Sequence, residues 1–120
     1  MEELSERMEE MEYNGSWRRI KNCALDFLSV GCDPTEEEEW WDWMQRNVLL
    51  KSMFFYCDFC KMIPAAPPHQ KKPLSHLATA LLSSFQELEN ALKLRSVPRA
   101  CDGYEKASAI LQEIIGFLMT

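Results

Sequence analysis

The sequence has few glycines, and no long apolar run of the kind that crosses a membrane. Only four glycines occur among 120 residues, and the periodic spacing of apolar residues favours helices over strands. The longest apolar stretch, residues 47–60, is interrupted by Lys51 and Asp58, so it is too short and too charged to span a bilayer. These absences predict a compact helical domain, for which 120 residues suffice without a stabilising metal.

Basic residues are also in deficit. The chain has 13 Lys and Arg against 19 Asp and Glu, a net charge of −6. Proteins that bind nucleic acid or anionic lipid need a basic face to displace counterions, so we expect neither as a partner. The sequence contains no G-x-S-x-G, phosphate-binding glycine loop or H-E-x-x-H, and its two histidines have no carboxylate partner fixed by spacing.

The five cysteines form no regular framework, and an odd count leaves at least one thiol unpaired within the chain. Cys57 and Cys60 have the C-x-x-C spacing of redox pairs and of half a zinc site. Redox pairs usually lie at a helix N-terminus, however, whereas these two fall late in a predicted helix. Only His69 and His76 are near enough in sequence to complete a zinc site. We predict buried structural thiols without a metal, with a redox or metal role as the alternative.

Residues 1–15 form a predicted acidic arm, separate from a bundle domain at 16–120. The arm has helical apolar spacing at Leu4, Met8 and Met11, and Asn14-Gly15 is predicted to end its helix. It resembles neither a secretory signal nor a transit peptide. If the protein is targeted, we expect its targeting segment to be missing from this chain.

Four helices are predicted after the arm. The first runs from Ser16 to Gly31, and a capping box at residues 33–36 starts a second that reaches about Ile63. Four prolines in residues 64–73 predict the main loop. The third helix runs from Leu74 to about Arg95, and the fourth follows Pro98, where Asp102 and Glu105 have capping-box spacing. The predicted fold is an all-α, up-down-up-down four-helix bundle with a short N-terminal helical arm.

Three tryptophans cluster at the start of the second helix. On a helical wheel, Lys51 and Asp58 share the direction of Trp40, whereas apolar residues further along lie opposite. The predicted apolar face therefore moves by half a turn, which is more than supercoiling explains. Either the arm or the proline-rich loop covers the indoles, or they contact a partner, with Trp40 the leading candidate. The predicted interface residues are Trp40, Trp41, Trp43, Met44, Lys71 and Lys72, where the two lysines are either solvated loop charges or a docking contact.

Three segments resemble a known family. "LLKSMFFYCDFCKMI" (49–63), "KKPLSHLATALLSSFQELENALKLRS" (71–96) and "YEKASAILQEI" (104–114) are similar to PsbQ-like proteins of plant chloroplasts, and most similar to the PsbQ-like lumenal subunits of the chloroplast NADH dehydrogenase-like (NDH) complex. The resemblance covers residues 16–115, and the stretch from Trp40 to Asp58 is its most distinctive part.

The resemblance implies a four-helix bundle without catalytic residues or cofactors, peripheral on the lumenal side of the thylakoid membrane. It implies contacts with lumenal and membrane subunits of the NDH complex and its photosystem I supercomplex, and support of cyclic electron flow. An extrinsic PsbQ-type subunit of the photosystem II oxygen-evolving complex is the alternative. The net negative charge favours the NDH subunit, because PsbQ itself is basic. A small thiol-redox or metal-binding helical protein is the third possibility.

Overall fold

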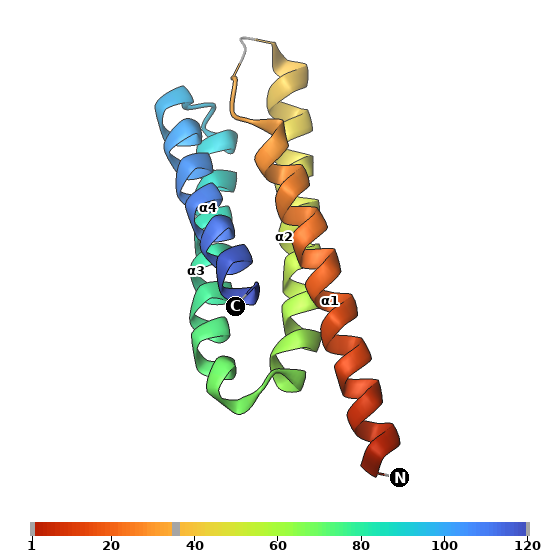
Figure 1. Ribbon diagram of the computed structural model, residues 1–120. Coiled ribbons are helices and arrows are strands. Elements are labelled where there is room, and N and C mark those ends of the chain that lie inside the picture. Colours follow the sequence, from red (N-terminus) through yellow and green to blue (C-terminus); the bar gives the residue numbers. More distant parts are fainter. Residues whose placement is uncertain (1, 35–36, 120) are drawn as a thin grey trace.

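Four long helices make up a single bundle in the computed structural model, which describes residues 2–34 and 37–119 (Figure 1). They are α1 (Glu2–Val30), α2 (Glu38–Ala65), α3 (Pro68–Lys93) and α4 (Val97–Leu118). Contacts join α1 to α2, α2 to α3 and α3 to α4, and more sparsely α1 to α4. Successive helices run in opposite directions (Figure 1), so the predicted all-α up-down-up-down bundle is confirmed.

The predicted break at Asn14-Gly15 is wrong, because α1 continues through it from Glu2 to Val30. A glycine inside a helix costs about 1 kcal/mol, and tertiary contacts on both sides offset that cost. The Tyr13 hydroxyl donates to Gln70 Oε1 at 3.3 Å on α3, and Ser16 is fully buried. The turns before Tyr13 extend past the end of α2 (Figure 1), and Met8 and Met11 are exposed there. The side chain of Leu4 lies outside the described part.

The proline-rich stretch is not the main loop that the sequence predicts. Pro64 lies in the last turn of α2, and Pro68 takes the first position of α3, where its missing N–H has no helical partner to lose. Only Ala66 and Pro67 separate the two helices. Pro73 lies inside α3, and it removes one backbone hydrogen bond from the second turn.

The other helix ends are close to the predicted ones. Gly31, at φ +70°, ends α1 as expected. α2 begins at Glu38, and the predicted capping bond of Glu36 lies outside the described residues. α4 begins at Val97 with Pro98 in its first turn, so Asp102 lies one turn inside the helix and does not cap it. α3 ends in a Schellman motif, in which Arg95 N–H and Ser96 N–H donate to Leu92 and Ala91 carbonyls.

The centre of the core is built from one aromatic ring of each helix. Phe27 of α1 contacts Phe85 of α3 edge-to-face with ring centroids 5.1 Å apart, and it lies 4.7 Å from Tyr104 of α4. Phe55 of α2 stacks on Phe85 at 5.6 Å. The Tyr104 hydroxyl donates to the Phe27 carbonyl at 2.6 Å and accepts from Gly31 N–H at 2.9 Å. This cluster therefore joins all four helices and fixes the end of α1.

Candidate partner interface

α2 buries one continuous face along its length, contrary to the predicted half-turn shift. The buried residues recur in steps of three or four positions, apart from the adjacent pair at 58 and 59; they are Trp41, Met44, Val48, Lys51, Phe55, Asp58, Phe59 and Met62. This spacing keeps them on one side of an α-helix. Lys51 and Asp58 thus lie on the side of α2 that faces the core. A prediction that assigns charged residues to solvent therefore places the core on the wrong side of α2 beyond Met44.

Two ion pairs to α1 explain how α2 buries charge. Lys51 Nζ lies 2.6 Å from Asp26 Oδ2, and Asp58 Oδ1 accepts from Arg19 Nε at 2.7 Å. The Lys51 and Asp58 side chains are only 10% and 11% exposed, while their partners are 66% and 54% exposed. A charge can be buried when an opposite charge is hydrogen-bonded to it. These pairs hold α1 against α2 and set the rotation of α2 about its axis.

In this orientation, a second apolar face of α2 is exposed to solvent. We call it the outer face of α2; its members are exposed by between 46% and 58%, and they are Trp43, Leu49, Leu50, Met53, Phe54 and Tyr56. Aromatic side chains have roughly 150–250 Å² of surface each, so these residues together expose on the order of 500 Å². The largest exposed apolar patch of a soluble monomer is of similar size and is often functional.

The tryptophan cluster divides among three environments. Trp41 and Met44 are in the core, at 4% and 0% exposure, so neither side chain can contact a partner of the folded chain. Trp40 is half-buried and packs edge-to-face on Trp41 at 4.9 Å. Trp43 is the exposed indole. The arm and the proline-rich segment lie at the other end of the bundle (Figure 1), so neither covers these rings as predicted.

Lys71 and Lys72 are exposed in the first turns of α3. They lie beyond the C-terminal end of α2, whereas Trp40 lies at its start, roughly 40 Å away at 1.5 Å per helical residue. The structure therefore does not bring the predicted lysines and tryptophans together into one site.

Cys57 and Cys60 are exposed on α2, so the prediction that they are buried is wrong. They lie beside the outer face of α2, where Cys60 also raises the pKa of Tyr56 through a hydrogen bond. The zinc alternative required His69 or His76 to join them. The described residues include no group of three or more His, Cys, Asp or Glu side chains placed to hold a metal ion.

Shallow grooves flank the outer face of α2 on both sides. One lies against α3 and is lined mainly by apolar groups, among them Tyr56, Ile63 and Leu82. The other lies against α1, between Arg19, Cys23 and Phe54. The outer face of α2 thus protrudes between two grooves, and another helix or loop could pack against it.

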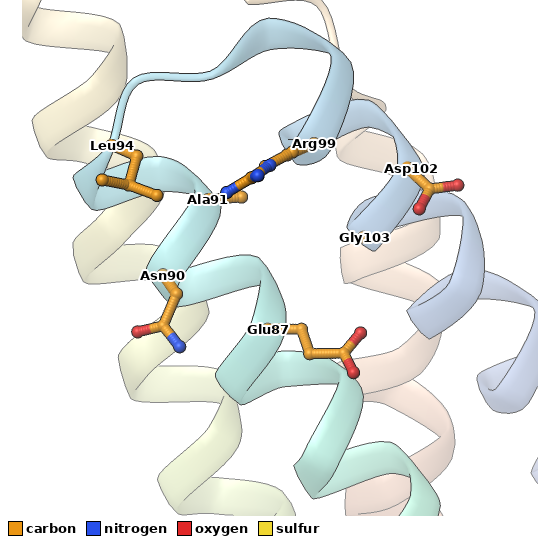
Figure 2. Close-up of a pocket in the computed structure, with 7 residues that line it drawn as sticks. All are labelled: Glu87, Asn90, Ala91, Leu94, Arg99, Asp102 and Gly103. Carbon is orange, nitrogen blue, oxygen red and sulfur yellow. The ribbon is translucent and has the colours of Figure 1, made fainter.

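A separate pocket, away from the outer face of α2, is lined by several charged and polar side chains. It lies between the end of α3 and the start of α4, and Figure 2 shows Arg99 reaching across it toward α3, with Glu87 and Asp102 at its rim. Its volume is about 220 Å³, below the roughly 300–1,000 Å³ of small-molecule sites. Gly103 allows the close helix approach beneath it, because a Cβ there would lie 3.3 Å from Leu88 Cα.

None of the helices in the described ranges combines the length and apolar character that a bilayer-spanning segment needs.

Comparison with known proteins finds one matching family and several relatives named as chloroplast proteins. Residues 4–119 match the family described as "PsbQ: Oxygen evolving enhancer protein 3". The chain is 30% identical over 105 residues to "Photosynthetic NDH subunit of lumenal location 3, chloroplastic" of Arabidopsis thaliana, an alignment that covers 84% of this chain and 45% of the relative. It is 28% identical over 98 residues to "Oxygen-evolving enhancer protein 3-1, chloroplastic" of Zea mays, which covers 82% of this chain and 42% of that protein.

The chain thus spans less than half the length of these curated relatives. Its match to the family nevertheless includes all four helices and nearly every residue. The resemblance inferred from residues 49–63, 71–96 and 104–114 is confirmed, and the chain belongs to the PsbQ family.

Proposed function

We propose that this chain is a non-catalytic accessory subunit of the chloroplast NDH complex, on the lumenal side of the thylakoid membrane. The single observation that carries a binding role is the outer face of α2, which leaves six large apolar side chains in solvent. The NDH assignment is supported by the similarity to the Arabidopsis thaliana protein whose name places it there. In this role the subunit would support assembly of the complex with photosystem I and cyclic electron flow.

The charges around the outer face of α2 favour a particular kind of partner. Arg46 and Lys61 are exposed on this face, near its two ends. The sole acid between them is Asp58, which is buried and paired with Arg19. Asp42 is exposed next to Trp43, at the same end of the face as Arg46. The face is therefore apolar, with charges of both signs at its first end and a cation, Lys61, at its last end, in a protein of net charge −6. It is complementary to an apolar helix or loop that carries an acidic residue opposite Lys61.

A second copy of this chain fits the face less well. If two outer faces paired antiparallel about their midpoint, Arg46 of one copy would face Lys61 of the other. Like charges placed opposite each other across an interface disfavour association, and the net negative charge of both copies adds a long-range repulsion. A different polypeptide is therefore the occupant that we propose.

The alternative is an extrinsic subunit of photosystem II, supported by the similarity to the Zea mays protein. Fractionation of detergent-solubilised thylakoids on native gels separates the two proposals. We expect a tagged form of this chain to migrate with NDH and photosystem I subunits, and to be absent from those bands in plants that lack the NDH complex. Migration with photosystem II, unaffected by loss of NDH, would replace the leading proposal with the alternative.

A further inference from the structure

Cys32 and Cys101 are the closest pair of thiols in the bundle. Cys32 follows Gly31 in the connection between α1 and α2, and Cys101 lies in the second turn of α4. Their sulfur atoms are 3.5 Å apart, although the residues are separated by 69 positions in sequence. Both side chains are half-buried. The fold therefore brings two thiols from distant parts of the chain into direct contact.

The surrounding contacts hold this pair in place. The Tyr104 hydroxyl accepts from Gly31 N–H at 2.9 Å and donates to the Phe27 carbonyl at 2.6 Å. Tyr104 is three residues after Cys101, almost one helical turn away, and Gly31 immediately precedes Cys32. One side chain thus fixes both backbone segments that carry the thiols. A sulfur–sulfur bond is about 2.05 Å long, so the remaining approach is a small side-chain movement.

We infer that Cys32 and Cys101 form an intrachain disulfide that fastens the α1–α2 connection to α4. The co-reactant is an oxidised disulfide, either a small molecule or a protein dithiol couple. One cysteine attacks it as a thiolate and forms a mixed disulfide, and the second cysteine then displaces the co-reactant's remaining sulfur. Two electrons pass to the co-reactant, and the two thiol protons end on its two released sulfurs.

The other cysteines are less suited to this reaction. Cys57 and Cys60 are three residues apart on one face of α2, where β-carbons are roughly 5–6 Å apart. A disulfide requires a Cβ–Cβ distance of about 3.5–4.5 Å, so that pair could bond only by distorting the helix. Cys23 lines the groove beside Arg19 and Phe54 instead.

The disulfide would strengthen the contact between α1 and α4. Contacts between α1 and α4 are the sparsest of the four helix pairs, and the bond would join their ends covalently. It would also restrict the connection that leads into the first two turns of α2, where Trp40 and Trp43 lie. Because the closed loop is long, the bond removes considerable chain entropy from the unfolded state.

The test is a thiol map of the purified chain equilibrated with oxidised glutathione, quenched in acid and alkylated. We expect one crosslinked peptide pair, Cys32 with Cys101, and alkylation confined to Cys23, Cys57 and Cys60. Reduction should lower the melting temperature by about 10 °C or more. Five alkylated cysteines, or a Cys57–Cys60 bond in place of the expected one, would overturn the inference.

Matched variants separate this outcome from a general effect of thiol loss. Cys57→Ser should retain the crosslink and the sensitivity of melting to reductant. Cys101→Ser should lose both, with Cys32 alkylated instead. In the reduced protein, burial and the Cys101 thiol raise the pKa of Cys32 to about 12. Its alkylation rate should therefore keep rising with pH up to that value, whereas a plateau near pH 9 would contradict both the burial of Cys32 and its contact with Cys101.

Discussion

Met53→Glu should weaken binding of this subunit to its complex by at least about 30-fold while leaving the isolated bundle folded. Met53 is 56% exposed near the middle of the outer face of α2. Large side chains at the centre of an interface often contribute 2 kcal/mol or more to binding, which is equivalent to roughly 30-fold in affinity. A glutamate there would be desolvated without a partner, and it would face the acidic groups that we expect near the interface.

The measurement is rebinding of purified variants to membranes stripped of this subunit, followed by separation on native gels. Ala109→Glu is the matched control, because Ala109 is exposed on α4 and the substitution adds the same charge to another helix. The control should bind as the parent chain does, and both variants should melt within a few degrees of it. Equal loss of binding by the two variants would show that net charge, rather than the outer face of α2, controls association.

Phe85→Ala should lower the free energy of unfolding by about 3–5 kcal/mol. Phe85 is fully buried, and its ring contacts Phe27 and Phe55 at centroid distances of 5.1 and 5.6 Å. The substitution removes the centre of the aromatic cluster and leaves a cavity between three helices. Since many domains have a total stability of only 5–15 kcal/mol, the variant should be close to unfolding at 37 °C.

Urea denaturation followed by circular dichroism gives this value, and Phe54→Ala provides the comparison. Phe54 is 58% exposed, so its removal should change the free energy of unfolding by less than about 1 kcal/mol. The two phenylalanines therefore separate the core from the proposed interface in one experiment. A loss at Phe54 as large as that at Phe85 would mean that the outer face of α2 is part of the folded core.

Much of the fold could be predicted from sequence because the apolar spacing in α3 and α4 is regular. Leu81, Phe85, Leu88 and Leu92 recur in steps of three and four, and all are buried. The helix ends are harder to predict, since a cluster of prolines indicates a loop, yet Pro64 and Pro68 fit the end of one helix and the start of the next. The predicted break at Gly15 is wrong for a similar reason, because the burial of Ser16 and the hydrogen bond from Tyr13 to Gln70 offset the local glycine cost.

The outer face of α2 is hard to locate from sequence because α2 has two apolar sides. In residues 48–56, Lys51 and Ser52 are the two residues that are not hydrophobic, and one helix cannot bury its whole circumference in a four-helix bundle. Polarity alone marked the Lys51 and Asp58 side as exposed. The signal that could have corrected this was the pair of opposite charges on the first helix, Arg19 and Asp26, which neutralise Asp58 and Lys51. Spacing within α2 gives no information about those partners.

The central claim is that the outer face of α2 contacts another polypeptide in the assembled complex. Its most direct test is a photoreactive phenylalanine derivative placed at position 54, compared with the same residue at position 109, in chains bound to thylakoid membranes. We predict a crosslink from position 54 to a different polypeptide, identifiable by mass spectrometry, and none to that polypeptide from position 109. Crosslinks from position 54 only to lipid or to a second copy of this chain, or the same polypeptide captured equally from both positions, would contradict the claim.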